Sequence, residues 1–183
     1  MANDGADITL LPLGVIERRV LAHVAAAVTR AFPGHLVAVS PAGRLPRGIW
    51  NTARGQCDST RLIRYLDRHQ VCPAGKLLAI CDTDLCTQIL TFVFGEAEVG
   101  GCYAVMSLHR LRPEVYGMPR SEALFFDRSG KEAIHELGHT FGLRHCYRYD
   151  CVMHSSDSIE ATDLKREGFC PRCRSLVPRA PNC

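Results

Sequence analysis

The segment 135–145 reads HELGHTFGLRH, and it limits what this chain can fold into and do. His135 and His139 are four residues apart, so on a helix both imidazoles project from the same face. That separation lets both rings bind one zinc ion at about 2 Å. Glu136 would lie beside such a metal, where its carboxylate can accept a proton from a water molecule on the metal.

A third metal ligand is predicted from the glycine near the end of this helix. Gly142 can adopt a positive φ and turn the chain sharply, which returns His145 to the metal. Three protein ligands leave one position open for water, and this arrangement is typical of catalytic rather than structural zinc sites. Three imidazoles also accept cobalt, nickel or iron, but the ligand type favours zinc.

The chain has ten cysteines, and four of them form a second pattern. Cys146 directly follows the third histidine, Cys151 comes five residues later, and Cys170 and Cys173 form a Cys-x-x-Cys pair. Two thiolate pairs separated by such a spacer predict a tetrahedral Cys₄ zinc site. Two disulfides are disfavoured because the N-terminus lacks the pattern of a signal peptide. A redox Cys-x-x-Cys is disfavoured because no thioredoxin-like βαβ pattern surrounds it. The other cysteines are expected to be buried free thiols: Cys57, Cys72, Cys81, Cys86, Cys102 and Cys183.

These motifs resemble those of the metzincin zinc peptidases, in which His-Glu-x-x-His-x-x-Gly-x-x-His precedes a methionine turn. Met153 is the matching methionine. The resemblance implies that its side chain forms an apolar floor beneath the metal. A methionine that simply packs in the core under the site is compatible with this role. With the cysteines included, the pattern looks like that of the archaemetzincins, and so do the segments 82–85 (DTDL), 92–97 (FVFGEA) and 104–111 (AVMSLHRL). The resemblance extends from about residue 7 to residue 175. Cys86 departs from it, because a tyrosine is expected there, and this bears on local packing.

The resemblance implies a metzincin-like α/β fold and zinc-dependent hydrolysis of peptide bonds. Zinc on the three histidines would lower the pKa of its water toward about 7. Glu136 would accept the proton from that water and then deliver a proton to the leaving amine. A peptide or protein substrate would pair with an edge strand, as in metzincins, and the candidate residues are Tyr103, Ala104, Val105, Met106 and Ser107.

Two other functions remain open at this point. A zinc hydrolase of non-peptide substrates would use the same ligands, and a metal-stabilised peptide-binding protein would show little catalysis. Glu136 disfavours the second, because a purely structural site does not need that carboxylate. The Cys₄ zinc would contribute folding free energy to a C-terminal segment with little core of its own. Because Cys146 adjoins His145, loss of this zinc is expected to damage the catalytic site.

Apolar runs and their periodicity predict alternating strands and helices, and hence an α/β fold. Strands are expected at 8–13, 36–39, 76–81, 90–94 and 103–108, and helices at 15–32, 59–68, 121–142 and 158–166. Prolines and glycines predict a long loop at 41–57. We expect one catalytic domain in two parts. Residues 1–142 would carry the sheet and the active-site helix, and residues 143–183 the third histidine, the methionine turn and the Cys₄ site.

Composition excludes several other classes of protein. The net charge is +3, from 22 basic and 19 acidic residues, which is too mild and too scattered to indicate a nucleic-acid or membrane partner. The apolar runs are too short to span a bilayer. Without a signal-peptide pattern, a cytoplasmic protein is the expectation. We also expect a monomer with two zinc ions per chain.

Overall fold

A five-stranded sheet forms the centre of the computed structural model, which describes residues 7–69 and 75–178. The strand order is β2-β1-β5-β8-β7; the first four strands are parallel, and β7 runs antiparallel to β8 at one edge. The bounds are Ile8–Leu13 (β1), Val37–Val39 (β2), Lys76–Cys81 (β5), Gly95–Ala97 (β7) and Tyr103–Ser107 (β8). A small second sheet contains β3 (Trp50–Asn51), β4 (Gln56–Asp58) and β6 (Leu85–Cys86). The predicted mixed α/β fold is confirmed.

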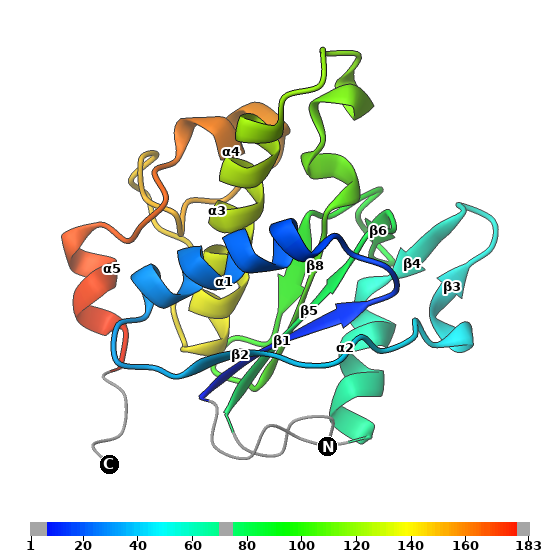
Figure 1. Ribbon diagram of the computed structural model, residues 1–183, viewed down its shortest axis with the longest axis horizontal. Helices are drawn as coiled ribbons and strands as arrows, with labels where there is room; N and C mark the ends of the chain where they lie inside the picture. Colours follow the sequence, from blue (N-terminus) through cyan, green and yellow to red (C-terminus); the bar gives the residue numbers. More distant parts are fainter. Residues whose placement is uncertain (1–6, 70–74, 179–183) are drawn as a thin grey trace.

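Helices cover both faces of the large sheet (Figure 1). α1 (Arg18–Ala31) and α3 (Glu122–Thr140) pack together on one face, and α2 (Ser59–Arg68) packs on the other. Successive strand residues point to opposite faces. In β5, therefore, Leu78 and Ile80 contact the core under α1 and α3, whereas Leu77 and Ala79 contact the core under α2. Burial on both faces explains why the central strands read as continuous apolar runs.

The expected strand at 90–94 is wrong, and the edge strand is β7 instead. Residues 90–94 form only an isolated bridge between Val93 and Leu85. Tertiary context overrides strand propensity here, because β8 pairs with Gly95–Ala97 while the ring of Phe92 lies 4.3 Å under the guanidinium of Arg110. The expected loop at 41–57 is also more ordered than predicted. It contains a 3₁₀ turn at Arg47–Ile49 and the hairpin of β3 and β4.

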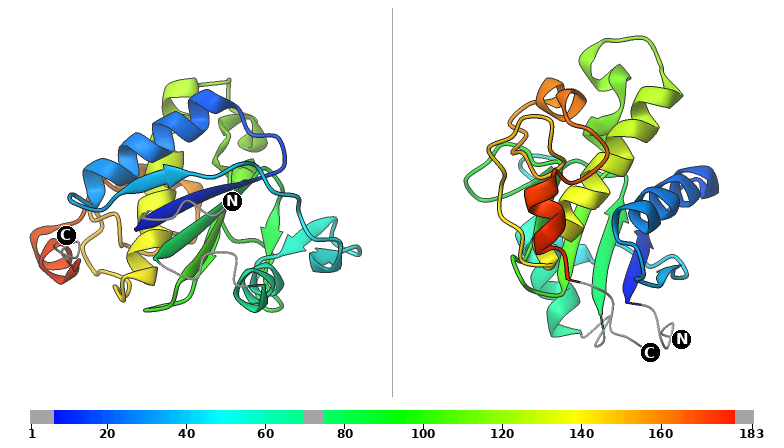
Figure 2. Two further views of the ribbon diagram at one scale, coloured as in Figure 1. Left: turned by 60° about the horizontal axis from the view of Figure 1, so that its bottom comes forward. Right: turned by 90° about the vertical axis from the view of Figure 1, so that its left-hand side faces the viewer.

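The chain beyond α3 is mostly irregular and lies against that helix (Figure 2, orange to red). Its helices are α4 (Ile159–Leu164), within the helix expected at 158–166, and α5 (Pro171–Leu176). Arg128 on α3 is 1% exposed and donates hydrogen bonds to both carboxylate oxygens of Asp163 at 2.7 Å. This ion pair between a buried guanidinium and a solvent-accessible carboxylate fixes α4 on α3. Within the described parts of the chain, no helix is long and apolar enough to cross a membrane.

Candidate active site

Three histidine side chains converge at the C-terminal end of α3. His135 and His139 are one turn apart on the helix, and His145 follows the helix end. Nε2 of His135 lies 3.1 Å from Nε2 of His139, and the candidate ligand atoms of all three residues lie within 4.8 Å of one another. Gly142 makes this convergence possible: its φ is +90°, and its N–H donates to the carbonyl of His139 at 2.8 Å.

Backbone carbonyls orient two of these rings. Nδ1 of His135 donates to the carbonyl of Val152 at 2.8 Å, and Nδ1 of His139 donates to the carbonyl of Leu143 at 2.7 Å. With the proton on Nδ1, each neutral ring presents a lone pair on Nε2. Two such lone pairs cannot hydrogen-bond to each other, so their close approach fits a shared cation. Zinc–nitrogen bonds of about 2.0–2.1 Å in tetrahedral geometry would place the nitrogens about 3.3 Å apart.

The environment also keeps these imidazoles in the neutral form that binds metals. Burial lowers the pKa of His135 well below its ordinary value, and burial lowers the pKa of His139 and His145 as well. An uncharged imidazole can donate its Nε2 lone pair to a metal without first losing a proton. The donor set therefore fits a zinc ion with three protein ligands and an open position.

Met153 packs on α3 at Gly138, which lies between His135 and His139 in the sequence. It is fully buried, and a Cβ at residue 138 would overlap its sulfur atom, so Gly138 leaves the space that Met153 fills. The N–H of Cys146 donates to the carbonyl of Met153 at 2.8 Å. The methionine therefore packs against the part of α3 that carries His135 and His139.

Glu136 lies beside the histidines with one carboxylate oxygen free. The residue is 4% exposed, and its Oε2 has no hydrogen-bond partner. Burial raises the pKa of Glu136 well above its ordinary value, and the carboxyl of Glu132, one turn earlier on α3, raises it further. Lys165 opposes both effects with its positive charge. On its other side Glu136 contacts Gly95, where a Cβ would come within 2.6 Å of the glutamate Cγ.

A cleft of about 540 Å³ runs along α3 past these residues. One wall is the edge strand β7 with the loop before it, and the opposite wall includes Ser155, Ser156 and Asp157, which follow the methionine turn. Glu132 lines the cleft together with the histidines and Glu136. The cleft is therefore bounded by a free strand edge on one side and by the C-terminal segment on the other.

The candidate substrate strand predicted from the sequence is wrong. Residues 103–107 form β8, which lies between β5 and β7 and is not an edge strand. The side chains of Tyr103, Ala104, Val105, Met106 and Ser107 are all buried in the two cores or within the sheet. An edge role is impossible because both sides of β8 are already hydrogen-bonded to neighbouring strands. The free edge beside the histidines belongs to β7.

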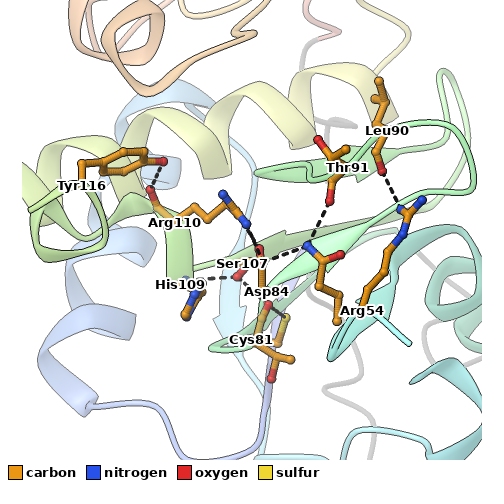
Figure 3. Close-up of polar contacts among 11 residues, drawn as sticks. Arg54, Cys81, Asp84, Leu90, Thr91, Ser107, His109, Arg110 and Tyr116 are labelled. Carbon is orange, nitrogen blue, oxygen red and sulfur yellow. Dashed lines mark hydrogen bonds and ion pairs between the residues drawn. The ribbon is translucent and has the colours of Figure 1, made fainter. Parts of the chain in front are cut away.

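Polar contacts hold the loop before β7 (Figure 3), and residues of this loop line the cleft. Arg110 forms a bidentate ion pair with Asp84 at 2.6 and 2.7 Å, and Gln56 donates to Asp84 at 2.8 Å and to the carbonyl of Thr91 at 3.0 Å. Arg54 donates to the carbonyl of Leu90 at 3.2 Å. The loop at 87–94 has little regular structure, so these side chains determine its position.

The four cysteines of the second pattern also converge. The sulfur atoms of Cys146, Cys151, Cys170 and Cys173 lie within 4.8 Å of one another, with 3.9 Å between Cys146 and Cys170. Zinc–sulfur bonds of about 2.3 Å in tetrahedral geometry give about 3.8 Å between sulfurs. The N–H of Cys170 donates to the sulfur of Cys151 at 3.3 Å, and a backbone hydrogen bond from Cys173 lowers the pKa of Cys170 to about 7. This donor set fits a closed zinc site.

The remaining described cysteines are free thiols. Cys57, Cys81 and Cys86 are buried, as expected, whereas Cys102 is exposed. Burial raises the pKa of Cys57 to about 11 and that of Cys81 to about 12, so both thiols stay protonated at neutral pH. The expectations for Cys72 and Cys183 lie outside the described residues.

A sequence profile of peptidase family M54 matches residues 33–179. The chain belongs to this family. It is 36% identical over 166 residues to an archaemetzincin of Methanocaldococcus jannaschii, and the match covers 91% of this chain and 89% of the relative. It is 37% identical over 183 residues to an archaemetzincin of Pyrococcus furiosus, and the match covers 94% of this chain and 93% of the relative.

Solved archaemetzincin structures share the fold of this M54 member. The crystal structure of the Archaeoglobus fulgidus protein, complexed with malonate, matches with a TM-score of 0.80 at 34% identity, covering 93% of this chain and 99% of that one. The Methanopyrus kandleri protein matches with a TM-score of 0.82 at 30% identity, and the match covers 97% of this chain and 96% of that one. The resemblance to archaemetzincins inferred from the motifs is thereby confirmed, and the chain is a zinc metallopeptidase.

Four residues of the M54 site were missed by sequence reasoning. Glu132 lies four positions before Glu136, so helical periodicity alone could have placed it on the cleft face of α3. Gly138 and Gly95 are small because Met153 and Glu136 approach their backbones, which only the packed structure reveals. Lys165 carries no local signal, because it follows α4, far along the chain from Glu136, on which its charge acts.

Proposed function

We propose that this chain hydrolyses peptide bonds with a zinc ion held by His135, His139 and His145, and with Glu136 as general base and general acid. The observation that carries the proposal is the shared cleft, in which three converging Nε2 atoms stand beside a buried carboxylate with a free oxygen. A purely structural metal site would have no use for that carboxylate. The M54 relationship supports the same reading.

The chemistry divides between the metal and the protein. When bound, the zinc supplies Lewis-acid chemistry, which polarises a peptide carbonyl and acidifies water. Glu136 would take the proton that the attacking water loses, and its unpartnered Oε2 supports this role. The raised pKa of Glu136 suits this role, since a stronger base holds the proton until the leaving amine accepts it.

We propose that the substrate lies extended along β7. The outer edge of Gly95–Ala97 is free of strand partners and lines the cleft, so its backbone can add a peptide by β-augmentation. The hydroxyl groups of Ser59 and Thr60, at the start of α2, donate to the carboxylate of Glu96. These bonds tie the short edge strand to α2 and keep it in register for pairing.

We further propose a second, structural zinc on Cys146, Cys151, Cys170 and Cys173. This zinc would hold residues 143–183 together as a small subdomain of the catalytic domain, because the described residues 143–178 are largely irregular and their helices are short. The same subdomain supplies His145, the floor at Met153 and one wall of the cleft. Its role in catalysis would therefore be indirect.

Zinc content and peptide-library cleavage test the proposal together. Wild type should bind two zinc ions per chain and cleave peptides. Glu136→Gln should keep both ions and lose cleavage by about 10²-fold or more. Two zinc ions with no cleavage of any peptide by wild type would contradict the peptidase mechanism and favour a binding role or a non-peptide substrate. Equal cleavage by Glu136→Gln and wild type would contradict the role of the glutamate.

A further inference from the structure

The C-terminal end of α3 is bonded to a turn at the edge of the large sheet. The last carbonyl groups of a helix have no partner within the helix and must find one elsewhere. The carbonyl of His139 accepts two hydrogen bonds, from the N–H of Gly142 at 2.8 Å and from the N–H of Gly100 at 2.9 Å. Gly100 belongs to the β7–β8 turn, residues 98–101. One candidate metal ligand is therefore bonded through its backbone to the turn that follows the edge strand.

Hydrogen bonds and one special backbone conformation give the β7–β8 turn its shape. The N–H of Gly101 donates to the carbonyl of Glu98 at 3.0 Å, and Gly100 has a φ of +74°, a conformation that favours glycine. Val99, which precedes Gly100, lines the cleft. The turn thus carries part of the cleft wall as well as the contact with His139.

Lys76, the first residue of β5, connects this turn to the residue that follows α3. Its ammonium donates to the carbonyl of Gly101 at 2.8 Å and lies 5.4 Å from the centroid of the Phe141 ring. A cation is attracted to the face of an aromatic ring, and it is also favourable at the negative, C-terminal end of a helix. The ring of Phe141 in turn stacks on that of Phe32, with 5.0 Å between centroids. One side chain therefore joins the β7–β8 turn to the end of α3.

We propose that Lys76 is a positioning residue of the active site. By holding the β7–β8 turn against the end of α3, it fixes His139 relative to the edge strand on which we place the substrate. The inference rests on the proposed function, because this spacing matters for catalysis only if a peptide lies on β7 and a metal on His139. It assigns a role to a side chain outside the lining of the cleft, from a strand that β8 separates from β7.

Zinc affinity and peptidase kinetics of two substitutions test this inference. Lys76→Met keeps the apolar stem and removes the ammonium. The affinity of the histidine site for zinc, measured by chelator competition with the cysteine cluster loaded, should fall by about threefold or more, because contacts that orient a ligand tune its metal. At saturating zinc, kcat should fall by about tenfold with KM within about twofold, because a displaced metal slows the reaction of a bound peptide. Lys76→Arg keeps a cationic donor and should restore both values to within about twofold of wild type.

Arg112→Met is the matched control, because Arg112 makes the same kinds of contact at the other end of α3. Its guanidinium donates to the carbonyl of Leu108 at 3.1 Å and lies 5.0 Å from the centroid of the Phe125 ring. The variant should have a lower Tm with wild-type zinc affinity and kcat. Equal losses in Arg112→Met and Lys76→Met would show general destabilisation and overturn the inference. A Lys76→Met protein with lower Tm but wild-type zinc affinity or kcat would overturn it as well.

A pair of glycine substitutions keeps the test decisive if Lys76→Met does not fold. Gly100→Ala places a methyl group where φ is +74° and no atom lies within 4 Å, so it strains the β7–β8 turn without a clash. Gly117→Ala imposes a similar strain in the loop before α3, where φ is +71° and no atom lies within 4 Å. Only Gly100→Ala should weaken zinc binding at the histidines. Equal zinc affinities in the two variants would contradict the inference.

The proposed function and this inference fail in different ways. If zinc-loaded wild type cleaves no peptide, the peptidase function fails, whereas the zinc affinities of Lys76→Met and Arg112→Met still decide whether Lys76 positions His139. If wild type cleaves peptides and Lys76→Met matches it in zinc affinity and kcat, only the inference fails.

Discussion

The carbonyl oxygen of Val152 accepts a hydrogen bond from Nδ1 of His135 at 2.8 Å, across 17 positions of sequence. Val152 lies between Cys151, a member of the cysteine cluster, and Met153, which packs on Gly138 of α3. The two candidate metal centres therefore share one stretch of backbone. A disturbance of the cysteine cluster should reach the histidine that begins the motif as well as the one that ends it.

Cys170→Ser should damage both centres. The variant should lose the zinc of the cysteine cluster, unfold at lower temperature and cleave peptides at least about tenfold more slowly, because the carbonyl of Val152 no longer holds its place. Zinc content, thermal unfolding and peptidase rate measure these effects. Cys102→Ser is the control, since Cys102 is exposed and outside the cluster. Full peptidase activity in Cys170→Ser would contradict the coupling.

Gly138→Ala should destabilise the protein although alanine favours helices. The new methyl group would overlap the sulfur of Met153, so we expect the free energy of unfolding to fall by about 1–3 kcal/mol. Urea denaturation measures the change. Gly48→Ala, where a Cβ meets no atom within 4 Å, should change little. Adding Met153→Ala to Gly138→Ala should relieve the overlap; a purely additive loss would argue against this contact.

Gly95→Ala should impair catalysis more than stability. A Cβ there would lie 2.6 Å from Cγ of Glu136 and 2.7 Å from the carbonyl of Val105, so either the edge strand or the glutamate must move. We expect kcat to fall by about tenfold or more, with zinc binding retained. Steady-state kinetics and zinc content check this. Wild-type kcat in the variant would show that Glu136 does not depend on the close approach of β7.

The three histidines of the site should make the metal-free protein sensitive to acid. Their pKa values are lowered in the folded state, so the unfolded chain binds more protons once the pH falls below the ordinary histidine value near 6.5. Stability should therefore decrease as the pH falls from 7 through this window and recover as it rises. Denaturation at several pH values should show a steeper loss in wild type than in His135→Gln/His139→Gln/His145→Gln. Equal slopes would exclude the histidines as the cause.

The chemistry of the site was readable in the sequence because it depends on short spacings. Two histidines four apart on a helix share a face wherever the helix lies, and Gly142 permits the turn that brings His145 back. The Cys-x-x-Cys pair is likewise local, and Cys146 and Cys151 form a second pair with a short spacing of its own. The alternation of apolar runs gave the α/β fold for the same reason, since strand and helix periods are local properties.

The substrate wall and the supports of Glu136 were decided only by tertiary structure. Gly95–Ala97 has poor strand propensity, and it becomes the edge because β8 offers hydrogen bonds there while Phe92 packs against Arg110. The Arg128–Asp163 ion pair joins α4 to α3, and the charge of Lys165, which follows α4, acts on Glu132 and Glu136. Ligand spacing is determined within a few residues of chain. The strand edge and the charge balance depend on contacts between segments that only folding brings together.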